Sequence, residues 1–489
     1  MAVFEYEPGR HFRQIDQLRQ TLRLASGADN IIRGDSFQRG VSMLSAFRTY
    51  CEASEIGEVV AVATSAVRDA ANGAGFVAAA KERASIDLDI LAGEVEARYG
   101  VLGVANSHAF RDALVLDVGG GSAQLSFMEG RSFVEGRSWP VGGVRMTEAF
   151  LKSDPPRGQE LQALREHLHT VVDGRLSGLP QGLPMVGMGG TIRNLARLHQ
   201  ARNNYPVSLL HGYVLTYDDV CELADELSAK TYAQRKSISG LNSERADVIV
   251  AAATVVRTFM EMARTERLVV SSHGLREGLL YHRMWPAESG HLAPDVRAFT
   301  IDNVARRYYD RPKHNAQVCK LSLQLFDGLA PWHQFTGFER ELLEAAAKIH
   351  DIGMAVDYFE HHHHGRFLVS ASPLPGFNHR EQALIALLVG CHRKGKPRIG
   401  KFSALLQPGD AERLAKLAGM LRLAEYLERT KAQRVQGLQC HLGAGYLQVE
   451  VAASGDVSVE LQAANQRSDL LAKTFGVQVE VVLGGPAIS

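Results

Sequence analysis

The stretch ALVLDVGGGSAQLSF, residues 113–127, holds an apolar run, three successive glycines and a return to alternating apolar residues. This pattern predicts a strand, a tight turn and a second strand. Successive glycines adopt backbone conformations that other residues avoid, so several N–H groups can converge on one anion. The stretch therefore favours a phosphate-binding loop over Gly119, Gly120, Gly121 and Ser122, with a plain glycine-rich hairpin as the alternative.

Asp117 ends the first predicted strand, two residues before the first of these glycines. A carboxylate at this point lies beside a phosphate held by the loop, where it can bind Mg²⁺ directly or through water. On this stretch alone, a surface aspartate in a hairpin is an equally good interpretation. Asp117 is thus a candidate magnesium ligand, and the strength of this interpretation depends on the other motifs.

The composition is that of a globular protein, with 489 residues, 45% hydrophobic and 22% charged. Such a length predicts roughly three or four domains. Because Lys plus Arg (54) equals Asp plus Glu (54), affinity for a polyanion must come from local clusters, and we expect no nucleic-acid partner. The sequence has no apolar run of membrane-spanning length, no signal-peptide core and no paired cysteine spacing, which predicts a cytoplasmic protein without a membrane partner.

Two other stretches have features that suit phosphate binding. Thr64 and Ser65 follow a predicted strand over 59–63, with Arg68 one helical turn later, although a helix N-cap with an exposed arginine explains the same pattern. A second glycine turn after the predicted strand 184–188 opens a helix, which is weak evidence alone. Two such turns about 70 residues apart indicate a duplicated phosphate-binding cleft, with these residues of the second turn as candidates: Gly189, Gly190 and Thr191.

The pattern from 297 to about 429 is almost wholly helical, which predicts a separate all-α region. It holds His314, the pair His350 and Asp351, and a run of four histidines over 361–364. Imidazoles and carboxylates spread over several helices favour a divalent-metal site. Basic residues, among them Arg393 and Lys394, form either a solvated loop or a binding strip for a polyanion. The tail over 432–482 predicts a small α+β module, with strands over 446–451 and 457–461 and a helix near 468–475.

Six segments in this order resemble the exopolyphosphatase and guanosine-pentaphosphate phosphohydrolase family of the actin-like superfamily: 63–72, 93–98, 117–125, 187–195, 244–247 and 272–278. The resemblance extends over essentially the whole chain. It implies an α/β fold class with two actin-like (ribonuclease-H-like) domains, followed by an all-α HD-like domain and a small α+β C-terminal domain. The corresponding ranges are 1–110, from which the first strand is missing, 111–287, 295–430 and 431–489.

The resemblance also implies roles for individual residues. Glu96, in a segment that reads GEVEAR, matches the glutamate that acts on the attacking water, and Asp117 matches the Mg²⁺ ligand. Arg68 is the candidate for neutralising charge. The substrate-binding residues are expected to be Thr64, Ser65, Gly119, Gly120, Gly121, Ser122, Gly189, Gly190, Thr191, Arg393 and Lys394. We further expect a homodimer.

The sequence departs from the family pattern in two places. The first phosphate loop of the family is absent, because the chain begins at what resembles the strand after it; we expect a start assigned too late, or else a chain that has lost much of its activity. Gln124 replaces a glutamate. Its amide can accept a hydrogen bond from metal-bound water, but the lost charge weakens Mg²⁺ binding. The HD-like domain is expected to be mainly a scaffold, with His314, His350 and Asp351 as a candidate second metal site.

The leading hypothesis is a Mg²⁺-dependent exopolyphosphatase that releases orthophosphate from the end of inorganic polyphosphate. A close alternative is removal of the 5′-terminal phosphate of guanosine pentaphosphate. Two others are an actin-like protein that binds polyphosphate or nucleotide without hydrolysing it, and an HD-type hydrolase that depends on His350 and Asp351.

Overall fold

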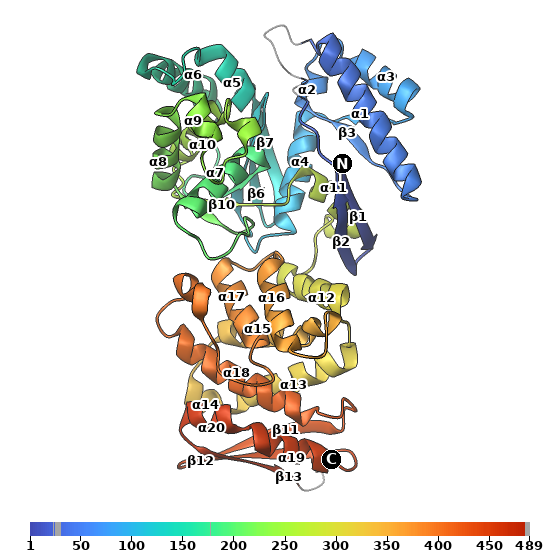
Figure 1. The fold of residues 1–489 in the computed structure, drawn as a ribbon, viewed down its shortest axis with the longest axis vertical. Coiled ribbons are helices and arrows are strands. Elements are labelled where there is room, and N and C mark those ends of the chain that lie inside the picture. The colour runs from blue at the N-terminus through green and yellow to red at the C-terminus, as the bar shows by residue number, and fades with distance from the viewer. Residues whose placement is uncertain (23, 25–30, 177, 485–489) are drawn as a thin grey trace. The chain divides into compact units, whose positions relative to one another are not determined.

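The computed structural model describes residues 1–22, 24, 31–176 and 178–484 (Figure 1). These residues group into two compact units, Met1–Pro294 and Asp295–Ser489. The finer division into four domains remains a prediction. Within the described residues, no helix is long and apolar enough to cross a membrane.

A six-stranded sheet in the order β7-β6-β5-β8-β10-β9 is the centre of the first unit. Strands β5, β6 and β7 form an antiparallel meander, β8 and β10 run parallel to β5, and β9 is antiparallel at the edge. The strands are β5 Ala113–Val118, β6 Ala123–Glu129, β7 Ser132–Trp139, β8 Met185–Met188, β9 Val214–Thr216 and β10 Arg267–Val270.

Helices cover both faces of this sheet because β5 is apolar on both sides. Leu114 and Leu116 point into one core, and Ala113 and Val115 into the other. The helices of the first face are α5 Gly143–Phe150, α6 Gly158–Leu176, α7 Gly189–Arg202, α8 Tyr217–Ser228 and α10 Ile249–Met262 (Figure 1). The second face packs on α4 (Gly93–Ala105), which in turn packs on α11 (Leu275–Met284).

Two small sheets complete the first unit. Strands β1 (Ala2–Glu7) and β2 (His11–Gln17) are antiparallel, whereas β3 (Ala61–Ala63) and β4 (Leu88–Ile90) are parallel. Helices α1 (Gly34–Ala53) and α3 (Gly73–Ala84) pack together through the ring of Phe76. In the described part of the chain, no strand joins the two ladders into one sheet.

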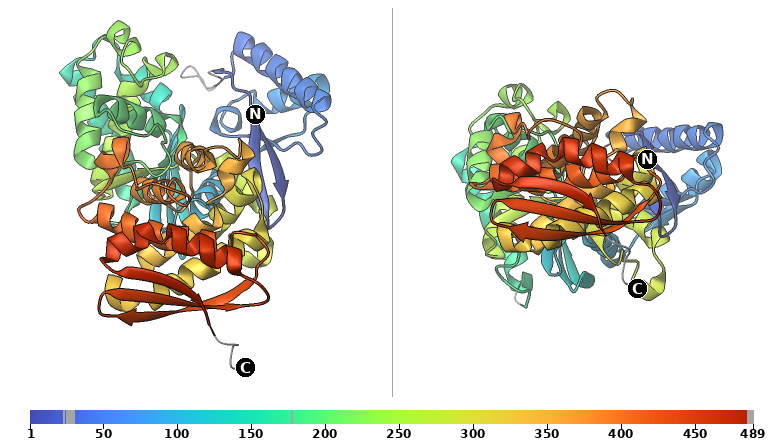
Figure 2. Two further views of the ribbon diagram at one scale, coloured as in Figure 1. Left: turned by 60° about the horizontal axis from the view of Figure 1, so that its bottom comes forward. Right: turned by 90° about the horizontal axis from the view of Figure 1, so that it is seen from below.

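The second unit is helical up to residue 427 and then forms a three-stranded sheet in the order β11-β12-β13. Helices α19 (Ser458–Arg467) and α20 (Asp469–Phe475) pack on α18 and on β13 (Figure 2). The main helices are α12 Val296–Tyr308, α13 Pro312–Gly328, α15 Gly337–Lys348, α16 His361–Ala371, α17 His379–Val389 and α18 Asp410–Leu427. The strands are β11 Val435–Gly443, β12 Tyr446–Ala453 and β13 Gln478–Leu483.

One element of the tail differs from the sequence prediction. The strand expected over 457–461 is wrong, because Ser458 begins helix α19. Val457, Glu460 and Ala464 are buried, and this spacing of three and four residues is helical. Alternation over only five residues also fits one turn of helix, and Oε1 of the buried Glu460 accepts a hydrogen bond from the backbone N–H of Thr430.

Candidate active site

The glycine loop between β5 and β6 is held from one side by the start of helix α5. The carbonyl oxygens of Gly119, Gly120 and Gly121 accept backbone hydrogen bonds from residues 142–145, at 2.9–3.2 Å. A trans peptide points its C=O and the following N–H in opposite directions, so the N–H groups of residues 120–122 point away from α5. The loop thus offers a row of amide donors on the opposite side, as an anion-binding loop requires.

Gly142 makes this contact possible. A Cβ atom at Gly142 would lie 2.4 Å from the backbone of Gly120 and Ser122. These neighbours are main-chain atoms that cannot move aside without changing the loop. The segment 141–143 therefore supports the glycine loop.

A cavity of about 370 Å³ lies beside the loop, within the first unit. Its walls come from the glycine loop, from the segment after β3 and from helix α4. A Cβ atom at Gly121 would lie 3.6 Å from Ser65 Oγ, which shows how near the two loops come. The predicted site residues that line the cavity are Thr64, Ser65, Glu96, Asp117, Gly119, Gly120, Gly121, Ser122 and Gln124.

Asp117 carries the strongest electrostatic perturbation in this cavity. Burial raises the pKa of its carboxyl group to about 6, and the negative charge of Glu96 adds to the rise, while Arg193 and Arg245 oppose it. Gln124 lies directly opposite Asp117 in the β5–β6 ladder. Two carboxylates and an amide oxygen around one cavity are the oxygen donors that Mg²⁺ prefers, so these residues fit the ion.

Arg68 contacts Glu96 and does not line the cavity within the described residues. Its Nη1 donates to Glu96 Oε2 at 3.0 Å and to the carbonyl oxygen of Leu91 at 2.8 Å. The glutamate side chain is 15% exposed. Arg68 therefore holds the carboxylate of Glu96 in place, and its expected role in neutralising charge on a substrate stays a prediction.

The second glycine turn braces the first. Gly189 has φ +88°, and a Cβ there would lie 2.4 Å from Asp117 Oδ1. The hydroxyl of Thr191 donates to the carbonyl oxygen of Val118 at 3.1 Å. Neither Gly189, Gly190 nor Thr191 lines the cavity in the described part of the chain. This turn thus supports Asp117 and the end of β5 from behind.

Arg193 and Arg245 are charged neighbours of Asp117 that the sequence reasoning did not assign. Burial lowers the pKa of both guanidinium groups, and the charge of Asp117 partly counters this. A Cβ atom at Gly190 would lie 2.3 Å from an Arg245 nitrogen, so the glycine leaves room for the arginine. Both arginines stand inside resembling segments, 187–195 and 244–247, but no local pattern reveals that distant segments bring them to Asp117.

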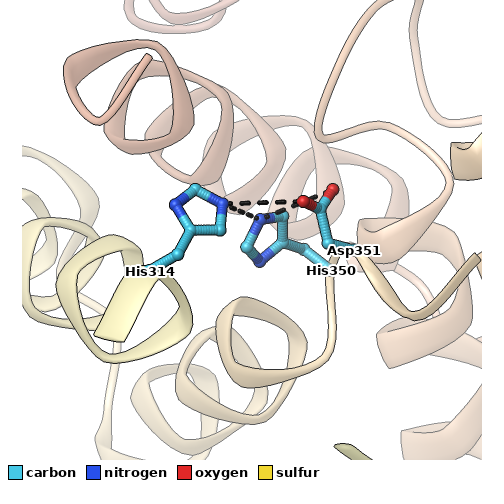
Figure 3. Close-up of side chains that lie close together, drawn as sticks. All are labelled: His314, His350 and Asp351. Carbon is cyan, nitrogen blue, oxygen red and sulfur yellow. Dashed lines mark hydrogen bonds and ion pairs between the residues drawn. The ribbon is translucent and has the colours of Figure 1, made fainter. Parts of the chain in front are cut away.

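The remaining predicted residues lie in the second unit. Arg393 Nη2 donates to the hydroxyl of Tyr358 at 3.3 Å, and Lys394 Nζ lies 2.7 Å from Glu360 Oε1. His314, His350 and Asp351 meet in the interior, with 3.2 Å between the two Nε2 atoms and 3.6 Å from His314 Nε2 to Asp351 Oδ2 (Figure 3). The structure thus brings together all three residues of the candidate second metal site.

Comparison with known proteins divides the chain near the boundary between the two compact units. Residues 2–286 match the Ppx/GppA phosphatase family, and residues 296–467 match domain III of Ppx/GppA phosphatases. A crystal structure of the Aquifex aeolicus member of the Ppx/GppA family is 30% identical, over 55% of this chain and 86% of that one, with a TM-score of 0.46. An exopolyphosphatase from Cytophaga hutchinsonii is 23% identical, over 57% of this chain and 95% of that one, with a TM-score of 0.52. The match to the family extends over more than half of the residues of this chain. The chain therefore belongs to the Ppx/GppA phosphatase family.

Proposed function

We propose that the first unit removes the terminal phosphate of inorganic polyphosphate and releases orthophosphate, with Mg²⁺ as the cofactor. The observation that carries the proposal is the cavity shared by the glycine loop, Asp117 and Glu96. Around this cavity, amide groups that can donate to phosphate oxygens lie close to two carboxylates, and these carboxylates differ in their surroundings. The likeness to a structure named an exopolyphosphatase supports the same substrate class.

The chemistry needs positioning and charge neutralisation more than covalent catalysis. The amides of residues 120–122 bind oxygens of the terminal phosphoryl group, and the hydroxyls of Thr64 and Ser65 face them across the cavity. Asp117 and Gln124 would hold Mg²⁺, which when bound neutralises charge on the phosphate. The buried guanidinium groups of Arg193 and Arg245 add positive charge close to Asp117.

We assign to Glu96 the role of activating the attacking water molecule. Held by Arg68, its carboxylate orients a water molecule toward the terminal phosphorus and accepts a proton from it. The water oxygen bonds to phosphorus while the bridging P–O bond breaks. The shortened polyphosphate then leaves with the electron pair of that bond.

The decisive test is phosphate release from long-chain polyphosphate by the purified chain with Mg²⁺. Glu96→Gln removes the proton acceptor and keeps the shape, and we expect a loss of at least ~100-fold in kcat. The matched control is Glu94→Gln, because Glu94 lies on the same helix turn but is 63% exposed and pairs with Arg98. Equal rates for Glu96→Gln and wild type would refute the assignment.

The same assay separates the other candidates. Guanosine pentaphosphate presents the same chain-end phosphate to the loop, so comparing kcat/KM for the two substrates decides between them. Polyphosphate binding without phosphate release would identify a binding protein instead. Cytoplasmic location and dimerisation remain predictions, and sedimentation of the purified chain measures the latter.

A further inference from the structure

The second unit contains a buried cluster of imidazole and carboxylate groups from several helices. His314 lies in α13, His350 and Asp351 follow α15, and His361 begins α16. His392 follows α17, and Glu425 lies in α18. Each of these six side chains belongs to a residue that is at most 7% exposed. A protein gains nothing from burying six ionisable groups together unless they bind one another or a ligand.

Backbone carbonyls fix the orientation of three of the rings. His350 Nδ1 donates to the carbonyl oxygen of Ala347 at 2.7 Å, and His361 Nδ1 to that of Tyr358 at 2.8 Å. His392 Nδ1 donates to the carbonyl oxygen of Val389 at 2.7 Å. A proton on Nδ1 leaves the lone pair of the neutral ring on Nε2, which is how proteins orient histidine ligands of metals.

These Nε2 atoms face one another in pairs. His361 Nε2 lies 3.0 Å from His392 Nε2, and His350 Nε2 lies 3.2 Å from His314 Nε2. In the His361–His392 pair, where Nδ1 of both rings donates to a carbonyl, two lone pairs at this distance repel unless a cation lies between or beside them. This pair marks a place for positive charge, and in the other pair the lone pair of His350 Nε2 faces His314.

Asp351 stands between the two pairs. Its Oδ1 lies 3.3 Å from His361 Nε2 and 3.6 Å from His392 Nε2, while its Oδ2 lies 3.6 Å from His314 Nε2. His350 Nε2 lies 3.8 Å from Oδ1, so the carboxylate of Asp351 is close to all four rings.

Glu425 completes the group on the side of His314 and His350. Its Oε2 lies 3.3 Å from His314 Nε2 and 3.0 Å from His350 Nε2. This oxygen is buried, and among the described residues its contacts with the two rings do not have hydrogen-bond geometry. A buried carboxylate oxygen beside two imidazoles without an aligned donor is a position that a shared cation would satisfy.

The distances suit metal coordination. Two ligands at about 2.1 Å from one ion, separated by tetrahedral or octahedral angles, lie about 3.0–3.4 Å apart. Most of the separations above fall within or just beyond that range. We propose that the second unit binds two transition-metal ions, one by His314, His350, Asp351 and Glu425 and the other by Asp351, His361 and His392. Four imidazoles favour Mn²⁺, Fe²⁺ or Zn²⁺ over Mg²⁺.

Basic residues next to the proposed ligands favour one class of substrate. Arg393 and Lys394 directly follow the ligand His392, and they contact Tyr358 and Glu360, which precede the ligand His361. Lys431 Nζ lies 2.7 Å from Asp351 Oδ2 and is partly exposed. Cations around a two-metal centre suit an anionic phosphate ester. In its hydrolysis, the water oxygen joins phosphorus, the ester P–O bond breaks, and the leaving alcohol takes the proton of the water.

The first experiment counts metal bound to the full chain. The chain is stripped with chelator, loaded with Mn²⁺ or Zn²⁺, desalted and analysed by elemental mass spectrometry. All variants carry Asp117→Asn, so that the oxygen site of the first unit does not contribute. We expect two ions per chain, one after His361→Gln, and none after Asp351→Ala.

The matched control is His364→Gln, because His364 belongs to the same run but to none of the groups of possible metal ligands among the described residues. It should retain two ions, and circular dichroism checks that every variant is folded. Fewer than two ions on the parent chain, or two on folded Asp351→Ala, overturns the proposal. The first result would mean that protons and Lys431 contribute to neutralising the carboxylates in place of metal, and the second would place the bound ions away from Asp351.

The second experiment tests the substrate class with p-nitrophenyl phosphate as the probe. In a Glu96→Gln background, the Mn²⁺-loaded chain should release p-nitrophenol, and Asp351→Asn should lower the rate at least 100-fold. A metal-loaded chain without this activity would overturn the phosphate-ester assignment. Because Glu96 lies in the first unit, failure here is distinguishable from failure of the proposed polyphosphatase activity.

Discussion

The carboxyl group of Asp117 has a pKa of about 6, raised first by burial and then by Glu96, against an ordinary value of 3.8. The folded chain therefore holds this proton more tightly than the unfolded chain. The free energy of unfolding of the metal-free protein must fall as the pH rises from about 4 to above 6, by an amount on the order of 3 kcal/mol.

Asp117→Asn should remove this pH dependence, because the amide stays neutral. We expect the variant to be more stable than the wild type at pH 7.5 without metal, by 1 to about 3 kcal/mol, and equally stable near pH 4. Urea unfolding at both pH values, in the presence of chelator, measures the difference. A variant less stable than wild type at pH 7.5 would show that the ionised carboxylate is well accommodated without a cation.

Arg68 acts through Glu96, so its removal should change kcat more than KM. Lysine keeps the charge of Arg68 but cannot reach Glu96 and the Leu91 carbonyl with the same geometry. Arg68→Lys is expected to lower kcat about 10- to 100-fold with KM within about twofold. The control is Arg98→Lys, whose exposed arginine pairs with Glu94. A large rise in KM at constant kcat would instead make Arg68 a substrate-binding residue.

At the scale of elements, the phosphate loop depends on the start of α5. A methyl group at position 142 would meet main-chain atoms of Gly120 and Ser122 at 2.4 Å, so the loop has to move. A shift of about 1 Å in a binding loop costs on the order of 100-fold in rate, and we expect Gly142→Ala to lose that much phosphate release. Gly158→Ala is the control, since a Cβ at that helix start meets nothing within 4 Å. Similar activities of the two variants would show that the loop does not depend on the start of α5.

The elements that sequence reasoning predicted well are those with a long or distinctive local pattern. The glycine hairpin over 113–127, observed as β5 and β6, and the helical region from 297 to about 429 have patterns many residues long. The segment 457–461 was too short to distinguish a strand from a helical turn. The local sequence around Asp117 was enough to recognise its motif. Arg193 and Arg245, the neighbours of Asp117, come from distant segments, and only the folded chain shows that the three residues lie near one another.

At the scale of the whole molecule, the two units carry different candidate metal sites, one built from oxygen donors and one rich in imidazole. A ligand stabilises only the unit that binds it, by ~2.7 kcal/mol at a hundred times its Kd. If the units unfold separately, heating should show two transitions. Zn²⁺ or Mn²⁺ should raise the midpoint temperature of one transition by about 5–10 °C, and Mg²⁺ with pyrophosphate should raise the midpoint temperature of the other. Differential scanning calorimetry of the wild type and Asp351→Ala checks this assignment, because only the imidazole-dependent shift should vanish in the variant. A single transition that both additions move equally would show that the chain unfolds as one cooperative body, in which occupancy of either site stabilises the other.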